Sequence, residues 1–400
     1  MSSAIKLGLK ENWKQFTILI IVNAFVGGMV GLERTIFPKF AEQEFGISSK
    51  TAILSFIIAF GITKAITYYF TGKLANKYGR KNLLVLGWIF AIPIPFILLN
   101  ATSWNWVIFA NILLGINQGL TWSSTVVMKI DLVGDKDRGL AMGINEFAGY
   151  FAIGIVAFLT GAIAQEYGVV PYPFYLGVVI SVIGLILSIL FVNDTRKFVN
   201  QEQQIDTTEK LNNVFLETTF KNKNLSAITQ AGMVNNLNDG MIWGLLPILL
   251  VSLQFETKSI GIIAATYPTV WGIGQLFTGK MSDIYSKKAM LFWGMLFQGI
   301  AIISIIYISS FYGLIGIAIV LGFGTALVYP TFLSAIASTT TPSQRAESIG
   351  VFRLWRDLGY AIGAILSGII ADVWGLEYAI ITIGSITILS SLVVKFRMTE

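Results

Sequence analysis

The chain has 400 residues, of which 54% are hydrophobic and 12% are charged, and its formal net charge is +6. The apolar residues come in runs of about 20 separated by short polar turns, which is typical of a protein that crosses a bilayer many times. Because Cys and His are both absent, disulfides, thiolate or imidazole catalysis and the usual zinc and haem ligands are excluded. We therefore expect no cofactor, no bound metal and no enzymatic activity.

The predicted membrane spans begin after a polar lead, MSSAIKLGLKENWKQ. The first apolar run is long enough to span and no small-residue cleavage site follows it, so the lead is interpreted as cytoplasmic and not as a signal peptide. The pattern predicts twelve transmembrane helices. They lie at about 16–40, 50–72, 82–100, 104–128, 139–165 and 172–193 in the first half, and at about 225–251, 257–280, 289–309, 311–337, 346–371 and 377–395 in the second.

A polar segment of mixed charge, residues 194–224, separates the halves and is predicted to be a cytoplasmic linker, partly an amphipathic surface helix. The predicted domains are thus an N-terminal six-helix bundle at 1–193 and a C-terminal six-helix bundle at 225–400. If both termini are cytoplasmic, 21 of the Lys and Arg residues that flank the spans lie on the cytoplasmic side and 3 lie on the opposite side, as the positive-inside rule requires. This rule explains the net positive charge better than nucleic-acid binding does.

Two turns of similar sequence, GKLANKYGRK at 72–81 and GKMSDIYSKK at 279–288, follow the second and the eighth predicted spans. Gly72 and Gly279 are 207 positions apart, and the same offset relates Arg138 to Arg345. The chain therefore contains two copies of one architecture, which makes the two predicted bundles pseudo-symmetric.

The first turn resembles the loop between helices 2 and 3 of the major facilitator superfamily of secondary transporters, with the pattern G-x-L-A-D-x-x-G-R-K, and the resemblance spans nearly the whole chain. Asn76 stands where the family has aspartate. The resemblance implies that this aspartate holds the cytoplasmic side closed by pairing with an arginine and the start of helix 11. Without that charge, we expect a shift toward inward-facing forms. The implied cytoplasmic gate consists of Gly72, Asn76, Gly79, Arg80, Gly279 and Asp283.

Charged residues in the interior of the predicted spans, away from the span ends, are few: Glu33, Arg34, Lys64, Glu146, Asp239, Arg353, Arg356 and Asp357. Predicted helices 3, 6, 9 and 12, which face lipid in the resembled family, have none in their interiors. The charges thus avoid positions where each would cost about 2.5–3.5 kcal/mol. At 1.5 Å per residue, Lys64, Glu146 and Arg353 lie roughly 12–14 Å from the cytoplasmic edge, near the middle of a core about 30 Å thick.

These charges have two interpretations: they pair with one another and hold the halves together, or they mark a substrate or proton path. The charges nearer the cytoplasmic side are Lys64, Glu146, Arg353, Arg356 and Asp357, and they sum to +1. This excess of one cation favours an anionic or zwitterionic substrate. We predict that Arg353, with Lys64 or Arg356, contacts an anionic group of the substrate. The predicted proton carriers are Glu146 and Asp239, because Glu33 and Asp357 adjoin arginines that keep a carboxylate ionised.

Uncharged polar residues add a second set of candidates. Predicted helix 4 carries a stripe of Asn111, Gln118, Thr121 and Thr125, and predicted helix 7 carries Asn235, Asn238 and Asp239 on one face. Such residues line a cavity or form interhelical hydrogen bonds. Aromatic residues that either stack on a substrate or pack between helices are Tyr150, Trp243, Trp271 and Trp355.

Two departures bear on proton coupling. Asn111 occupies a position where many proton-coupled relatives have arginine, and helix 5 lacks the Gly-Pro pair of many drug/proton antiporters. Both weaken the standard drug-antiporter assignment, but the carboxylates remain as proton carriers.

The resemblance implies a monomeric secondary transporter in the cell (inner or plasma) membrane, moving a small organic solute by alternating access and coupled to protons. A multidrug/proton efflux antiporter and a lipid flippase on the same fold are the alternatives. A membrane-embedded enzyme would need a catalytic motif, and none is recognisable in this sequence.

Overall fold

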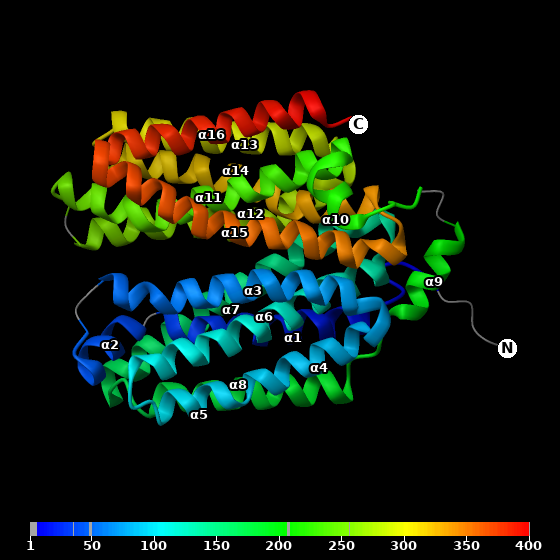
Figure 1. Ribbon diagram of the computed structural model, residues 1–400, viewed down its shortest axis with the longest axis horizontal. Helices are drawn as coiled ribbons and strands as arrows, with labels where there is room; N and C mark the ends of the chain where they lie inside the picture. Colours follow the sequence, from blue (N-terminus) through cyan, green and yellow to red (C-terminus); the bar gives the residue numbers. More distant parts are fainter. Residues whose placement is uncertain (1–5, 35, 48–49, 206–208, 256, 400) are drawn as a thin grey trace. The chain divides into compact units, whose positions relative to one another are not determined.

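The computed structural model describes residues 6–34, 36–47, 50–205, 209–255 and 257–399, and this part of the chain is helical and contains no β-strand. It forms two compact units, each of which collects segments distant in the sequence (Figure 1). Unit 1 comprises residues 1–136, 145–207 and 345–350, and unit 2 comprises residues 137–144, 208–344 and 351–400. Two long helices, α7 (Arg138–Tyr167) and α15 (Pro342–Trp374), contribute residues to both units.

Unit 1 is built around α6 (Trp104–Val133), which is buried on all sides from Asn117 to Val133. A helix that is enclosed all round must satisfy its polar side chains within the protein. It packs against α1, α3, α4 and α5, while α8 packs against α1, α4 and α5. The other helices of the unit are α1 (Trp13–Arg34), α2 (Phe37–Phe45), α3 (Lys50–Tyr78), α4 (Arg80–Ala91), α5 (Pro93–Leu99), most of α7, α8 (Tyr172–Leu190) and α9 (Arg196–Ile205).

Unit 2 has the corresponding plan around α14 (Phe311–Thr339), which packs against α12 and α13. Helix α16 packs against α11 and α13. The other elements of the unit are α10 (Val214–Leu216), a π-helical turn at Glu217–Lys221, α11 (Lys223–Ser252), α12 (Thr257–Ile284), α13 (Lys287–Ser304), a 3₁₀ turn at Ile305–Tyr307, most of α15, and α16 (Leu376–Arg397).

The predicted helices agree with the observed ones apart from differences at their ends and two larger corrections. The helix predicted at 16–40 ends at Arg34, and a separate helix, α2, begins at Phe37. The helix predicted at 82–100 is divided at Ile92, and α5 begins at Pro93. Both new helices have a proline in their first turn, which a helix tolerates there but not in its interior.

Eight segments of the described chain are long and apolar enough to cross a membrane: Trp13–Glu33, Arg80–Leu99, Asp135–Tyr167, Tyr172–Leu190, Lys287–Tyr307, Phe311–Thr339, Pro342–Trp374 and Leu376–Arg397. Four other predicted spans, represented by α3, α6, α11 and α12, fall outside this set. Charged or amide side chains interrupt their apolar runs, for example Lys64 in α3, Gln118 in α6 and Asp239 in α11.

The segments that α7 and α15 exchange between the units are held by glycine contacts. In unit 1, a Cβ on Gly72 of α3 would lie 3.0 Å from the Cα of Gly350 of α15. In unit 2, a Cβ on Gly279 of α12 would lie 2.9 Å from the Cα of Gly143 of α7. The 207-residue offset relates these two pairs, so both repeats use the same crossing. Only glycine permits backbones to approach this closely, as at small-residue crossings of membrane helices.

Candidate functional site

A buried carboxylate on α11 anchors the most extensive polar and aromatic network of the described part of unit 2. Asp239 is 6% exposed and accepts a hydrogen bond from the Tyr267 hydroxyl of α12. The same hydroxyl lies 3.3 Å from Thr325 Oγ1 of α14. Three helices therefore converge on one carboxylate, and its hydrogen-bond donor is a neutral phenol. A carboxylate held by a neutral donor can exchange its proton at a lower cost than one held by a guanidinium.

Aromatic rings connect Asp239 to an ion pair on α15. The Tyr267 ring stacks on Trp271 at a centroid separation of 6.0 Å, and Trp271 lies 4.9 Å from the ring of Tyr329. The guanidinium carbon of Arg356 lies 5.5 Å from the Tyr329 centroid, within cation–π range. The network thus combines a carboxylate, flat apolar surfaces and a cation. The rings and the cation are groups that can bind an aromatic or amphiphilic anion.

The positive end of the network is fixed by Asp357. Arg356 Nη2 lies 2.7 Å from Asp357 Oδ1, and Asn236 Nδ2 donates to the same oxygen over 3.4 Å. Arg353, one turn earlier on α15, is fully buried. Arg353 and Arg356 equal Asp239 and Asp357 in number of charges when both carboxylates are ionised. Protonation of Asp239 leaves one net positive charge, so a proton and an anion are complementary loads for this network.

A second network lies in unit 1, between α1, α6 and α7. Glu146 accepts hydrogen bonds from Trp122 Nε1 over 3.3 Å and from Asn145 Nδ2 over 2.7 Å. Asn145 also accepts a hydrogen bond from Lys129, whose side chain is fully buried. Asn23 of α1 donates to the Asn145 backbone carbonyl over 2.9 Å. Glu146 is therefore held by donors from its own helix and from α6, with a buried cation beside them.

The remaining charged candidates of unit 1 lie in different surroundings. Glu33 is buried in α1, and the side chain of Arg34 lies outside the described residues. Lys64 is half-buried in α3, with its Nζ 5.4 Å from the Phe60 ring centroid and 5.5 Å from that of Tyr68. Aromatic faces one turn before and after the lysine thus stabilise its charge.

Two residues of the polar stripe of α6, Gln118 and Thr125, form interhelical hydrogen bonds, and Asn111 and Thr121 bond to carbonyls of their own helix. Gln118 Nε2 donates to the Val26 carbonyl of α1 over 2.9 Å, and Thr125 Oγ1 donates to Asn23 Oδ1 over 2.9 Å. Asn111 is buried and donates to Val107 of its own helix. These bonds favour the interpretation that the stripe joins helices, because its donors are used within the protein.

The structure separates residues of unit 2 that the sequence groups together. The predicted shared face of α11 is divided, because Asn238 donates to Gln298 of α13 over 3.1 Å and accepts from Thr387 of α16, whereas Asp239 bonds to α12. Adjacent residues of a helix point about 100° apart, so they reach different neighbours. Trp355 does not join the aromatic network; its Nε1 donates to Thr219 in the π-helical turn over 3.1 Å.

The first gate turn is part of a buried charge cluster in unit 1. Gly79 has a φ of 87°, and Arg80 after it pairs with Asp131 of α6 at 3.2 Å. Arg345 of α15 makes a bidentate pair with Glu202 of α9, at 2.9 and 2.8 Å, and lies 3.9 Å from Asp131. The negatively charged partners of Arg345 are therefore Asp131 of α6 and Glu202 of α9. Asn76 in the gate turn is uncharged.

The second gate turn provides a helix cap in unit 2. Asp283 Oδ1 accepts from the Gly139 N–H over 2.6 Å, and its Oδ2 accepts from the Leu140 N–H over 2.9 Å. These are free N–H groups of the first turn of α7, where a carboxylate also favours the helix dipole. Asn76 is the equivalent of Asp283 at the 207-residue offset and is exposed in unit 1.

Sequence reasoning did not identify Lys129, Asp131, Asn145 and Glu202 as site residues. Lys129 and Asp131 lie just beyond the predicted end of their span at 128, yet α6 continues to Val133 and both side chains are fully buried. Glu202 lies in the polar linker and has its partner 143 residues away. No group of three or more acidic residues that could hold a metal ion occurs in the described part of the chain.

Comparisons with known proteins agree on one family. The family model described as Major Facilitator Superfamily matches residues 19–234 and 228–400. The chain is 24% identical to the proton-coupled antiporter flippase LtaA of Staphylococcus haemolyticus, over 93% of this chain and 90% of that protein. It is 25% identical to the multidrug resistance protein MdtG of Proteus mirabilis, over 91% of each. The crystal structure of the human organic anion transporter MFSD10 (TETRAN) covers 96% of this chain and 99% of its own, with a TM-score of 0.76 and 15% identity.

Proposed function

Because the chain belongs to the Major Facilitator Superfamily and is a multi-pass membrane transporter, we propose that it moves a small organic anion or zwitterion together with a proton by alternating access. The proposal places twelve spans in two six-helix bundles, at 1–193 and 225–400, with the linker 194–224 and both termini in the cytoplasm. The repeated gate turns and the distribution of Lys and Arg support this topology. The transporter acts as a monomer in the cell membrane.

The network from Asp239 to Arg356 is the observation that carries the proposal. Its carboxylate is bonded to a phenol, its cation is bonded to a second carboxylate, and the rings between them offer flat apolar surfaces. Asp357 neutralises Arg356 and is the fixed member of the pair, so Asp239 is the member free to gain and lose a proton. A side chain of this kind within a membrane helix marks an ion or substrate path by default.

Charge balance explains how proton and substrate are coupled. When Asp239 binds a proton, the four charged groups of the network carry one net positive charge, and a monoanion restores neutrality. Moving a neutral load avoids the penalty for a net buried charge in a low-dielectric interior. Arg353 and Arg356 supply the charge that attracts the anion, and the rings of Trp271 and Tyr329 hold its apolar part. Glu146 and Lys129 in unit 1 form a second titratable group on the proton path.

A lipid flippase is the second candidate, favoured by the similarity to LtaA over nearly the whole chain. A flippase and an organic-anion transporter would both use an aromatic surface beside a cation, because a phospholipid headgroup also carries a negative charge. Multidrug efflux, suggested by the similarity to MdtG, would instead require a site with an excess of negative charge for a cationic drug.

Reconstitution into proteoliposomes tests the proposal. An inward proton gradient should drive accumulation of aromatic carboxylates from a radiolabelled panel, with a matching fall of internal pH. Accumulation of quaternary ammonium compounds against an opposite proton flux would identify a drug antiporter. Translocation of a fluorescent lipid without carboxylate transport would identify a flippase, and either result would replace the proposal.

A further inference from the structure

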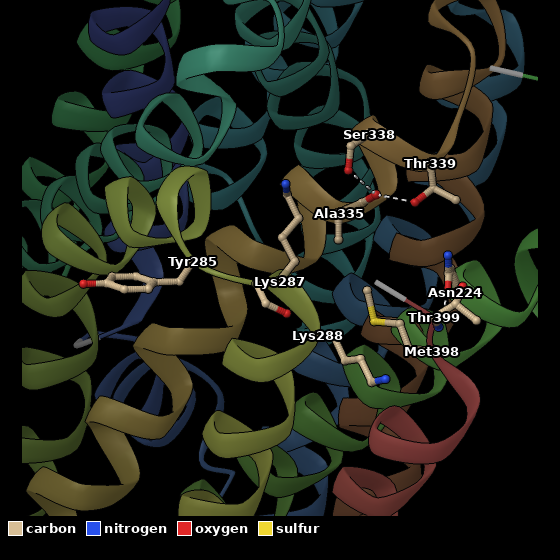
Figure 2. A pocket seen from close by; sticks show the side chains of 10 residues that line it. Asn224, Tyr285, Lys287, Lys288, Ala335, Ser338, Thr339, Met398 and Thr399 are labelled. Atoms are coloured by element: carbon tan, nitrogen blue, oxygen red, sulfur yellow. Dashed lines mark hydrogen bonds between the residues drawn. The ribbon is translucent and has the colours of Figure 1, made fainter. Parts of the chain in front are cut away.

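A cavity of about 560 Å³ lies in unit 2, apart from the network described above (Figure 2). It forms where the turn between α12 and α13 meets the last turn of α14, the start of α11 and the segment after α16. The residues of its lining that matter chemically are Asn224, Tyr285, Lys287, Lys288, Ser338 and Thr399. A cavity of this size admits a small polar group with room for attached atoms.

The cavity lining is positively charged. Lys287 and Lys288 are both half-buried, and the lining described by the structure contains no Asp or Glu. Neither lysine forms an ion pair with a carboxylate of the described residues. The two side chains point in different directions from adjacent positions (Figure 2). An ammonium group that is partly removed from water and has no counter-charge is stabilised by a bound anion.

The internal repeat has an acid in unit 1 that has no counterpart in this cavity. The 207-residue offset carries Arg80 onto Lys287 and Asp131 onto Ser338. In unit 1 the acid is present, and Asp131 pairs with Arg80 at 3.2 Å. In unit 2 the Ser338 hydroxyl donates to the Ala335 carbonyl over 3.1 Å, which Figure 2 shows as a dashed line, and it offers no charge. The second copy therefore retains its cations without the counter-charge of the first.

A further donor completes the site. Asn224 Oδ1 accepts from the Thr399 backbone N–H over 2.8 Å and from its hydroxyl over 3.1 Å, which leaves the amide NH2 group to donate to a ligand. Tyr285 on the lining is 60% exposed, and tyrosine is enriched where membrane helices meet the headgroup layer. In the proposed topology this turn faces the cytoplasm.

We propose that this cavity binds a phosphate group, held by Lys287, Lys288 and Asn224. Lysine binds phosphate as a point charge, and the missing counterpart of Asp131 provides the place for the anion. The two sources of such a group are the phosphodiester of an anionic lipid headgroup and inorganic phosphate. This site is separate from the network that is proposed to transport the substrate. Its ligand would stabilise or regulate the transporter.

Thermal unfolding of the purified full-length protein tests this site with two probes. One probe is inorganic phosphate added to protein in detergent, with sulfate-free chloride at equal ionic strength as reference. The other is a nanodisc of phosphatidylglycerol compared with one of phosphatidylcholine. We expect a rise in Tm of about 2 °C or more with at least one probe, because a ligand of the folded state raises its stability. Response to phosphate in detergent indicates the free ion, and response to phosphatidylglycerol alone indicates the lipid.

Two variants and one control make the result specific. Ser338→Asp restores the acid of the first repeat, so it should abolish the response to the probe while raising the Tm of the ligand-free protein. Lys287→Gln with Lys288→Gln should weaken binding about tenfold or more through loss of both charges. Lys6→Gln with Lys10→Gln removes the same charge from exposed positions and should leave the response intact. No response to either probe, or an equal response in Ser338→Asp and the parent protein, overturns the proposal.

Discussion

Asp239 and Asp357, the two carboxylates of the network in unit 2, have different hydrogen-bond partners. Asp357 is paired with the Arg356 guanidinium at 2.7 Å, whereas Asp239 is bonded to a hydroxyl. The ion pair keeps Asp357 charged, since protonating it would leave Arg356 without its counter-ion in a buried site. The hydroxyl of Tyr267 imposes no such charge requirement. This contrast supports the proposal that Asp239 transfers the proton and Asp357 belongs to a fixed ion pair.

Arg353 is the residue whose replacement tests the anion preference. It is fully buried on α15, beside the ion pair of the network. We expect Arg353→Ala to abolish measurable binding of an anionic substrate and Arg353→Lys to recover part of it, because lysine keeps the charge but loses the bidentate geometry. Ligand affinity and Tm should be measured together by titration and thermal unfolding. Unchanged affinity with a lowered Tm would show that the residue is purely structural.

Asp194 provides a pH-dependent test outside the membrane spans. Burial raises the pKa of this carboxyl, but hydrogen bonds from the backbone N–H groups of Arg196 and Lys81 and from the Arg196 side chain outweigh burial and lower the pKa below its ordinary 3.8. Its contribution to stability is therefore fully present above pH 3.8 and is lost as the pH falls through the lower folded-state pKa. These bonds cap the first turns of α4 and α9.

We expect Asp194→Ala to lower the free energy of unfolding by about 1 kcal/mol at pH 6, the usual cost of replacing a helix cap by alanine. The difference from the parent protein should stay constant down to about pH 4 and shrink at more acidic pH. Unfolding in denaturant at several pH values measures it. A difference that grows as the pH falls would contradict the lowered pKa.

At the level of helices, each segment that belongs to the other unit, 137–144 of α7 and 345–350 of α15, packs closely against a glycine of α12 or α3. A Cβ on Gly279 would lie 2.6 Å from the Gly139 carbonyl oxygen, whereas a Cβ on Gly272 of the same helix would meet nothing within 4 Å. We expect Gly279→Ala to cost about 1–3 kcal/mol by forcing α7 and α12 apart. Gly272→Ala is the matched control and should not lower the Tm. Equal Tm values for the two variants would exclude a tight crossing.

The linker helix α9 contributes a partner to Arg345. The bidentate pair with Glu202 is buried, so Glu202→Gln should weaken the cluster by roughly 1–3 kcal/mol, since it leaves Arg345 with Asp131 at 3.9 Å. Glu209→Gln removes an exposed carboxylate nearby in the sequence and serves as control. Limited proteolysis of the linker and the Tm should both respond to the first variant alone. Equal proteolysis rates in both variants would mean that the pair does not hold α9.

At the scale of the whole molecule, the sequence predicts most helices because an apolar run of about 20 residues between polar turns has few other solutions. It also predicts Glu146, Asp239, Arg353, Arg356 and Asp357 as charges within the spans, and all five are buried. The pairing of Asp357 with the adjacent Arg356 follows from the sequence. The partners of Asp239 and Glu146 on other helices were not predictable. The Tyr267 hydroxyl that bonds Asp239 is one aromatic residue among many, and nothing in its sequence neighbourhood distinguishes it.

Hydropathy failed at the ends of helices for a physical reason. The predicted span 104–128 stops before Lys129 because a lysine normally ends an apolar run, yet the helix continues to Val133. The buried Lys129 is stabilised by a hydrogen bond to Asn145, and Asp131 by the side chains of Arg80 and Thr195. These partners come from α4, α7 and the segment before α9, so the burial of both charges follows from tertiary contacts and not from local sequence.

Transport by Asp239→Asn in proteoliposomes measures most directly whether Asp239 carries the proton. Asparagine keeps the size of the side chain and a hydrogen bond to Tyr267 but cannot carry a proton. We expect the variant to lose accumulation driven by a pH gradient while it retains exchange of labelled for unlabelled substrate across the membrane. Full pH-driven accumulation in Asp239→Asn would contradict the assignment of this carboxylate as the proton carrier.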